Sequence, residues 1–571
     1  MSIRQIILLF MVVVCLFGAA GTLPDADRIQ EQLRGQAPVG PDPQNPQVVL
    51  LTHLLGGFKG IAVDALWLRA GALQQEGKFW ELYQLYTWMG KLEPGIEEIW
   101  VFNAWNMSYN LVADLQDSEA RWQWIQRAIA WLTDDGLKAN PRSAKIMEQI
   151  SLIYWHKIGR DTDMYNYYYK HRFALIMHRI FLSREEQDIP AIVKAPREFK
   201  DLLADPDVAA ALSRFRLNPP DKAVLAINKA ADLFDFSPEI TEVLRDEKYA
   251  AARKKIFAYT TARILRDRYG MKELDIMGIM EESFGKFDWR LPEPHAIYWA
   301  TLASVMEPIR NQSRQIKYER LMMYSLQSSM RRGLISYLGP NPDVPMVTAF
   351  DLSKIKPIDE LFQKQMAARP LSFPKQPEWN GEDSVRDGHV QFLQESEFNL
   401  YWAGYITEAQ KYHMELKKLY DKPVPYEDLE HVCVGKVKKL VDENGTLDKV
   451  RAFVDGLIIQ SCAHLCLNKA IEAHMSERLA RRAWEAYCTY TEAQQQGKIR
   501  VANAALPTWK QVLKGDVSQI LQGHVPAQLF PPVLIPVLRN ILKVPKGAEV
   551  DKLDVGEAIT PEVPPSSPPP K

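Results

Sequence analysis

The chain has 571 residues, which is enough for about three to five domain-sized units or for one long repeat array. Its 70 Lys and Arg residues balance 71 Asp and Glu residues, so no net electrostatic field draws the chain to nucleic acid, and we expect no nucleic-acid partner. A composition of 47% hydrophobic and 25% charged residues excludes wholesale disorder, a multispan membrane protein and a collagen-like fibre.

The first 24 residues have the pattern of an export signal or membrane anchor. No charge occurs from Gln5 to Pro24, while Arg4 precedes this stretch and Asp25 follows it. Its length matches the roughly 20 residues that a membrane helix needs, and the flanking charges favour a cytoplasmic N-terminus. We therefore expect a single-pass inner-membrane protein whose body lies on the periplasmic or extracytoplasmic side. Cleavage of the segment, or lipid attachment at Cys15, is the open alternative.

Residues 61–92 have the periodicity of two consecutive helices. Apolar residues recur every three to four positions on both sides of Gly77, and Pro94 follows the second helix. This spacing resembles the tetratricopeptide repeat (TPR), with Gly77 at the turn, Ala70 at the helix crossing and Tyr86 at an aromatic position of the second helix. The resemblance implies two helices packed against each other in antiparallel orientation.

The later units depart from the roughly 34-residue period of that family. The second unit ends at Pro141, 47 residues after Pro94, a third begins at Ser143, and the pattern returns near Gly404. We therefore predict an all-α fold: an irregular, TPR-like helical-repeat solenoid with an N-terminal membrane anchor. In chain order, the predicted regions are the anchor (1–24), a Pro-rich spacer (25–46), TPR-like repeats (47–182), a loop-rich insertion (183–245), a helical region (246–339), a second loop-rich insertion (340–387), a second TPR-like region (388–505), short helices and loops (506–549) and a disordered Pro-rich tail (550–571).

Four segments carry a second resemblance. They read LLGGFKGIAVDALWLRA, FNAWNMSYN, YWHKIG and FDWRLPEPHAIYWA, and they are similar to segments of large, single-anchor repeat proteins of the bacterial envelope. The resemblance implies an architecture and a location, and it implies no activity.

One predicted helix alternates aromatic and amide side chains. Asn103, Asn106 and Asn110 share one face, and Trp105 and Tyr109 share another. Asn is a poor helix former, so three on one face indicate either buried hydrogen bonds or a polar inner surface. The first helix of each helix pair lines the concave surface of a repeat array. The second alternative is therefore a peptide-binding groove formed by Asn103, Asn106, Tyr109 and Asn110. Both alternatives stay open at this point.

The segment FDWRLPEPHAIYWA holds the densest mixture of charged and aromatic side chains. Its residues Trp289, Arg290, His295 and Trp299 are candidates for a ligand site built by stacking and bidentate hydrogen bonds. The structural alternative, which we favour, is a loop locked onto the next repeat, with Arg290 paired to an acid such as Asp288. The two alternatives predict opposite effects of removing Arg290.

A charged cluster follows the first helix of the predicted third repeat, which begins at Ser143. It contains His156, Lys157, Arg160, Asp161 and Asp163, which are suited to binding an anion or a partner's carboxylate. The favoured interpretation is a helix C-terminus with cations near the negative end of the helix dipole, followed by acids that cap the next helix.

Two of the five cysteines lie one helical turn apart. Cys462 and Cys466, with His464 between them, form half of a potential metal site, which only Cys433 and His431 could complete. Both thiols fall on an apolar stripe, so core packing is the favoured interpretation. We therefore expect no metal and no cofactor.

The function prediction rests on architecture, because no enzyme motif is found. The chain has no GxGxxG, GxxxxGK[ST], HExxH or GxSxG pattern. We expect a non-enzymatic scaffold or partner-recognition protein of the bacterial envelope that binds a protein or peptide partner. The alternative is an all-α, glycan-active envelope hydrolase with an aromatic, acidic groove, since two catalytic carboxylates need no local motif.

Overall fold

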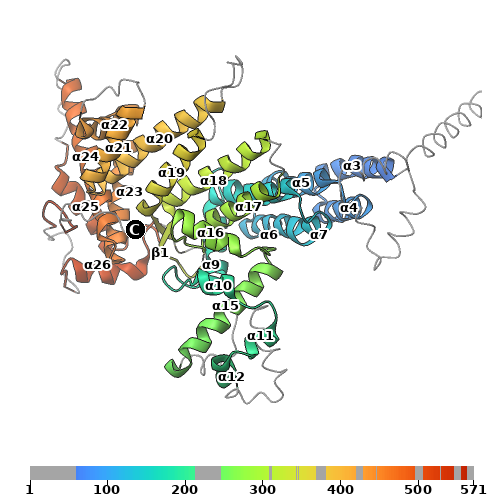
Figure 1. Ribbon diagram of the computed structural model, residues 1–571. Coiled ribbons are helices and arrows are strands. Elements are labelled where there is room, and N and C mark those ends of the chain that lie inside the picture. Colours follow the sequence, from blue (N-terminus) through green and yellow to red (C-terminus); the bar gives the residue numbers. More distant parts are fainter. Residues whose placement is uncertain are drawn as a thin grey trace, which may run out of the picture. The chain divides into compact units, whose positions relative to one another are not determined.

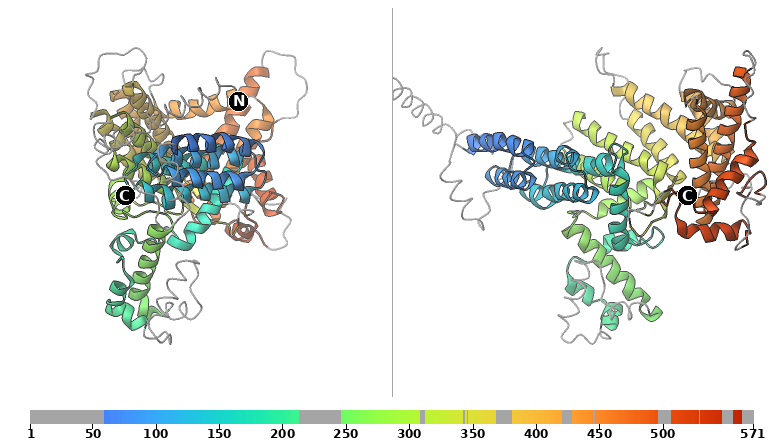
Figure 2. Two further views of the ribbon diagram at one scale, coloured as in Figure 1. Left: turned by 90° about the vertical axis from the view of Figure 1, so that its right-hand side faces the viewer. Right: turned by 180° about the vertical axis from the view of Figure 1, so that it is seen from behind.

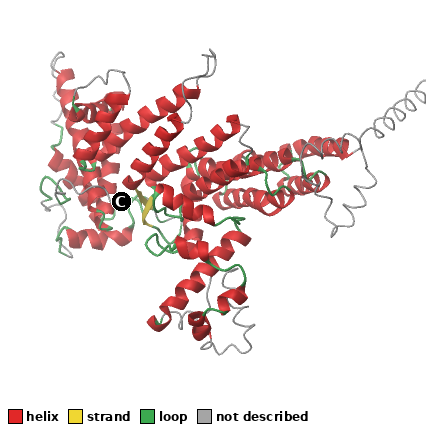
Figure 3. Cartoon of the chain, viewed as in Figure 1, coloured by secondary structure: helices red, strands yellow, loops and turns green. Residues whose placement is uncertain are grey.

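The computed structural model describes residues 59–212, 246–307, 312–341, 344, 346–367, 381–419, 428–444, 446–495, 506–527, 529–545 and 555–561. The predicted anchor and Pro-rich spacer lie outside the described residues. Within these ranges the chain is mostly helical with two short strands (Figure 3), which confirms the predicted all-α class. Across the same ranges, no helix has both the length and the apolar character that a membrane span requires.

The chain forms two compact units, and each consists of three separate stretches of sequence. The first unit consists of the described residues within 1–166, 188–276 and 295–322, and the second consists of those within 167–187, 277–294 and 323–571. This interleaving was not predicted, because local periodicity identifies helices without showing which distant helices pack together.

The first unit begins with a series of helix pairs. α3 packs on α4, as the spacing around Gly77 predicts, and Gly77 itself adopts φ +69° at the turn, a value that favours glycine. Figures 1 and 2 show α3 and α5 in one layer and α4, α6 and α7 in the other. The elements are α3 (Lys59–Gln75), α4 (Phe79–Leu92), α5 (Glu97–Trp105) with η2 (Asn106–Leu111), α6 (Ser118–Ala130) with η3 (Trp131–Gly136) and α7 (Leu137–Ala139), and α8 (Ala144–Leu152) with η4 (Ile153–Gly159).

Local sequence explains where these helices begin and which face they bury. The Asp117 side chain accepts a hydrogen bond from the backbone of Ala120 and caps α6, and Ser143 caps α8 in the same way. α4 buries Leu82, Tyr86, Met89 and Leu92, which are spaced three to four residues apart and so form one apolar stripe.

Three of the helices continue as π-helical segments, namely η2, η3 and η4. Such segments are rare and occur frequently at functional sites. η2 and η4 contact each other. Two of the three π-helical segments therefore lie side by side, each at the end of the first helix of its pair, α5 or α8.

A smaller cluster in the first unit is built by helices of the predicted insertion (183–245) and by the helix that follows it, α15. α12 packs on α15 around Val208, Ala211 and Ile256. Pro190 and Pro206 lie in the first turns of α10 and α12, where proline costs little because those N–H groups have no intrahelical partner. The elements are α10 (Ile189–Lys194), α11 (Phe199–Leu203), α12 (Pro206–Leu212), η5 (Glu247–Tyr249) and α15 (Ala250–Asp267).

The second unit contains the long C-terminal helices and the β-ribbon. β1 (Leu334–Tyr337) and β2 (Val347–Ala349) pair in antiparallel orientation, with Ile335 opposite Thr348. α23 packs on α24, α20 packs on α21, and Gly404 precedes α21 with φ +90°. The helices are α19 (Ile355–Ala367), α20 (Gly381–Trp402), α21 (Ile406–Leu419), α22 (Leu429–Asn444), α23 (Leu447–Cys466), α24 (Ala470–Gln495), α25 (Trp509–Leu521) and α26 (Ile535–Ile541), with the short turns η6 (Leu352–Lys354) and η7 (Pro532–Leu534).

Four further helices contain a boundary between the two units. They are α9 (Asn166–Phe181), α16 (Asp275–Phe284), α17 (Pro292–Met306) and α18 (Gln312–Arg332).

Part of the second predicted loop-rich insertion is helical. α19 lies within it and buries Ile355, Ile358 and Phe362, a spacing that the high proline content of the region obscured. Pro357 is in the first turn of α19, where it removes no intrahelical hydrogen bond. α20 also begins at Gly381, inside the range that we predicted to be a loop.

Candidate functional site

The amide side chains of the predicted peptide-binding helix point into the first unit. Asn106 Nδ2 lies 2.9 Å from Gln74 Oε1 and also donates to the hydroxyl of Tyr86. Asn110 Nδ2 donates to Asn106 Oδ1 over 2.7 Å. Asn103 is fully buried, and neither atom of its amide group has a hydrogen-bond partner in the described part of the chain. Asn106 and Asn110 thus follow the alternative of buried hydrogen bonds, and Asn106 ties η2 to α3 and α4.

The neighbouring face of the same helix carries aromatic rings, and rings from α3 and η4 extend them into a continuous series. We call Trp67, Phe102, Trp105, Tyr109 and His156 the aromatic row. The ring centroids of Trp67 and Phe102 are 4.9 Å apart, those of Phe102 and Trp105 are 6.0 Å apart, and Trp105 stacks on Tyr109 at 6.0 Å. Phe102 is 47% exposed and Trp105 is 38% exposed. The row therefore presents apolar ring surface to solvent along α3, α5 and η2.

The two contacting π-helical segments complete the row. Tyr109 of η2 and His156 of η4 form a hydrogen bond between the tyrosine hydroxyl and Nδ1, 3.2 Å apart. Burial raises the pKa of Tyr109, and burial lowers the pKa of His156, with smaller contributions from the charges of Arg160 and Lys157. Both rings are therefore neutral at physiological pH, and the bond links successive first helices without a net charge.

The charged cluster beside His156 is satisfied internally. Lys157 Nζ lies 2.6 Å from Asp163 and 5.3 Å from the centre of the Tyr109 ring. Arg121 lies 3.4 Å from the same carboxylate, and the Arg160 guanidinium lies 5.2 Å from the Trp155 ring. This arrangement agrees with the favoured helix-end interpretation, and it places cations at the η4 end of the aromatic row.

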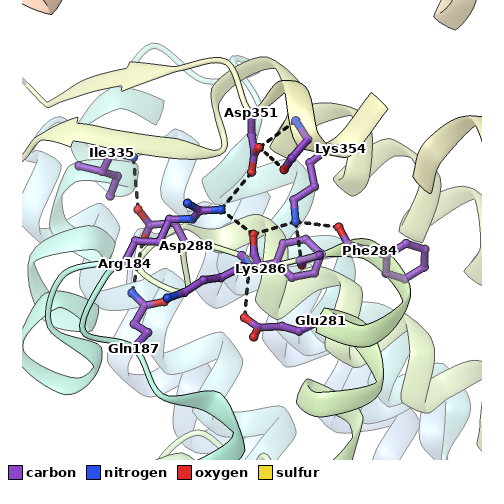
Figure 4. Close-up of polar contacts among 12 residues, drawn as sticks. Arg184, Gln187, Glu281, Phe284, Lys286, Asp288, Ile335, Asp351 and Lys354 are labelled. Atoms are coloured by element: carbon purple, nitrogen blue, oxygen red, sulfur yellow. Dashed lines mark hydrogen bonds and ion pairs between the residues drawn. The ribbon is translucent and has the colours of Figure 1, made fainter. Parts of the chain in front are cut away.

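A second polar network lies in the second unit and fixes the loop that follows α16 (Figure 4). Arg290 forms a bidentate pair with Asp288, with Nε–Oδ1 and Nη2–Oδ2 distances of 2.8 and 2.6 Å. The backbone N–H of Ile335 in β1 donates to the same carboxylate over 3.2 Å. Trp289 is fully buried and donates its indole N–H to Glu281 over 3.2 Å. Arg290 therefore has the loop-locking contact that our structural alternative describes.

Lys354 holds the other end of this loop (Figure 4). Its Nζ donates to the carbonyl oxygens of Phe284, Gly285 and Lys286, each at 2.9 Å, and it lies 3.7 Å from the centre of the Phe287 ring. A cation at the C-terminus of α16 is stabilised by the helix dipole and by the free carbonyls of the last turn. Burial lowers the pKa of Lys354 to about 8, so the ammonium form still predominates at neutral pH.

The remaining predicted site residues, His295 and Trp299, belong to the first unit and are buried. The His295 ring stacks on Tyr154 with centroids 5.4 Å apart, and the Trp299 ring packs edge-on against Tyr298. Of the eight predicted site residues, only Tyr109 therefore belongs to the aromatic row. The others form the buried contacts described above, with Asn110 half-buried.

Sequence reasoning missed Phe102 and Lys354. Phe102, Trp105 and Tyr109 are spaced at i, i+3 and i+7, and this signal was present but was obscured by the adjacent amides. The acceptors of Lys354 are about 70 residues away in sequence, and no local pattern marks such a partner.

The cysteine residues pack in the second unit. Cys462 is fully buried, and Cys466 donates to the backbone oxygen of Leu534 over 3.6 Å. Burial raises the pKa of both thiols, which keeps them protonated. Among the described residues, no group of three or more His, Cys, Asp or Glu side chains is placed to hold a metal ion.

Comparison of the chain with protein-family models, with curated proteins and with solved structures finds no match.

Proposed function

We propose that this protein is a membrane-anchored helical-repeat scaffold of the bacterial envelope and that its aromatic row binds an extended segment of a protein partner. The observation that carries the proposal is the exposure of Phe102 and Trp105 within a continuous series of rings. Aromatic residues are enriched at interfaces because they bury a large apolar area at a low entropy cost. The row lies on the first helix of successive pairs, which is the surface that helical repeats use for binding.

We further propose that the anchor holds this surface outside the cytoplasm and that the helix pairs form a TPR-like repeat. The support for the anchor is the uncharged stretch from Gln5 to Pro24 with Arg4 before it. The support for the repeat is the packing of α3 on α4 around Gly77. Extraction of membranes with carbonate tests the anchor, because release of the full-length protein would contradict it.

The binding role of the row is tested by photo-crosslinking with a matched control. A crosslinking side chain is introduced at Phe102, and adduct formation is measured with Trp105→Ala and with Trp80→Ala. Trp80 is 62% exposed on α4, outside the row, so both changes remove an exposed tryptophan. We expect Trp105→Ala to weaken a defined adduct by at least about tenfold, since a central aromatic contact contributes about 2 kcal/mol or more. Equal effects of the two changes would contradict the proposal.

An envelope hydrolase is a second candidate function, and one pair of acids favours it. Arg451 pairs with Asp455 at 2.7 Å and also with Asp516, and burial raises the pKa of both carboxyl groups. Two hydrogen-bonded acids with raised pKa values resemble a general-acid arrangement. Turnover of peptidoglycan fragments that Asp516→Asn abolishes without unfolding the protein would favour this function, and absence of turnover by the unaltered protein would contradict it.

A further inference from the structure

A short segment near the C-terminal end of the sequence is held against the second unit. Residues 555–561 form turns and bends rather than a helix or strand, within the region that we predicted to be a disordered tail. Val555 and Thr560 are buried, whereas Glu557, Ala558 and Pro561 are exposed. The segment therefore contacts the unit through a few of its side chains and leaves others in solvent.

The contacts of this segment are made mainly by one buried carboxylate. Glu477 of α24 accepts hydrogen bonds from the backbone N–H groups of Ile559 and Thr560 at 2.8 and 2.9 Å, and from the Thr560 hydroxyl. His474 Nδ1, one helical turn earlier, lies 3.2 Å from the same hydroxyl oxygen. The Thr560 hydroxyl thus donates to Glu477, and it can accept from His474 in the tautomer that carries the proton on Nδ1. An apolar residue of the same shape reproduces neither contact.

A second contact fixes the other end of the segment. Trp509, the first residue of α25, donates its indole N–H to the backbone oxygen of Glu557 over 2.9 Å. Arg481 lies 3.7 Å from the Glu557 carboxylate at the exposed edge. We call His474, Glu477, Arg481 and Trp509 the tail-docking face.

The segment supplies hydrogen-bond donors to Glu477. With the segment in place Glu477 is only 4% exposed, and a carboxylate buried to this degree is strongly unfavourable unless donors accompany the burial. Burial raises the pKa of Glu477, and the hydrogen bonds from Thr560 and Ile559 oppose that rise. The backbone of the bound segment therefore supplies donors that stabilise the ionised carboxylate.

We propose that the tail-docking face is a peptide-binding site for segments of the form Glu-Ala-Ile-Thr-Pro, and that residues 555–561 occupy it as a tethered, replaceable ligand. A tether gives an intramolecular ligand an effective concentration of about a millimolar. Only a segment of higher affinity, or one presented at high local concentration, can displace it. The docked tail therefore regulates access to a binding site that is separate from the aromatic row.

The test uses the full chain with a protease site placed between residues 546 and 553. The probe is a fluorescent peptide with the sequence of residues 553–563, and its binding is followed by anisotropy before and after cleavage. We expect the cleaved protein to bind the probe at least about tenfold more tightly than the intact protein, because cleavage removes the tether. Thermal unfolding before and after cleavage shows whether the rest of the chain stays folded.

Variants on each side of the contact identify the interaction. Glu477→Gln in the protein, or Thr560→Val in the probe, should weaken binding at least about tenfold, since each removes hydrogen bonds that involve a charged group. The matched control is Glu360→Gln, which changes an exposed glutamate of α19, outside the tail-docking face, and should leave binding unchanged.

Three outcomes would overturn the proposal. They are no binding of the probe by the cleaved protein, equal binding of a scrambled peptide, and loss of the folded state on cleavage. The last would show that the segment is an integral part of the unit. If the Glu477→Gln protein fails to fold, the Thr560→Val probe still tests the contact, because this substitution is made in the peptide and the protein is unaltered.

Discussion

Replacing Arg290 with Ala should destabilise the second unit, because it leaves a buried charge unpaired. The Asp288 carboxylate is fully buried and forms both of its shortest hydrogen bonds with Arg290. Removal of one partner from a buried pair costs about 3 to 5 kcal/mol. The backbone N–H groups of Ile335 and Arg290 still donate at 3.2 Å each, so we expect the lower end, about 3 kcal/mol.

Two further variants separate this cause from other effects of the change. Arg331 forms a bidentate pair with Glu395 at 2.6 Å but is exposed, so Arg331→Ala should cost less than about 1 kcal/mol. Adding Asp288→Asn to Arg290→Ala removes the buried charge and should recover at least half of the lost stability.

Thermal unfolding measured by circular dichroism decides the outcome. A loss of about 3 kcal/mol corresponds to a fall in melting temperature of roughly 5 to 10 °C. Unchanged melting of Arg290→Ala together with weakened capture of a partner would refute the structural argument and favour a binding role for Arg290.

Three other changes test the packing and the electrostatics. A Cβ atom on Gly90 would lie 2.7 Å from the ring of Trp100, so Gly90→Ala should destabilise the protein by about 1 to 3 kcal/mol in urea unfolding. A Cβ atom on Gly71 meets no atom within 4 Å, so Gly71→Ala should stabilise the protein by about 0.5 to 1 kcal/mol in the same measurement. Lys354→Met leaves three carbonyls without their donor and should cost about 2 to 4 kcal/mol, measured in the same way. Burial lowers the pKa of His171 from 6.5 to about 4. Between these values the unfolded chain binds more protons than the folded chain, so stability falls as the pH falls through this range. His171→Gln should therefore reduce the difference between the free energies of urea unfolding at pH 7 and at pH 4.5.

Local features of the fold could be predicted from the sequence, and long-range ones could not. The apolar spacing of α4 and the turn at Gly77 depend on neighbouring residues, so both appear in the sequence pattern. The helix that contains Asn103 and Trp105 was ambiguous because it is apolar on several sides, and periodicity alone does not show which face meets a neighbouring helix. The buried pairing of Arg290 was anticipated because Asp288 is only two residues away.

The first unit is assembled from stretches of sequence that are synthesised far apart in time, and this sets a constraint on how the protein folds. Ser151 donates to the backbone oxygen of Ala296 and Tyr154 stacks on His295, yet these partners emerge from the ribosome about 145 residues later. At a synthesis rate of about 5 to 20 residues per second, the apolar surface of α8 and η4 stays without these partners for roughly 7 to 30 seconds. During this delay the nascent chain is a partly folded intermediate with exposed apolar surface, which is prone to aggregate. We therefore expect the yield of folded protein in cells to depend on chaperones that cover the early helices until residue 322 has been synthesised.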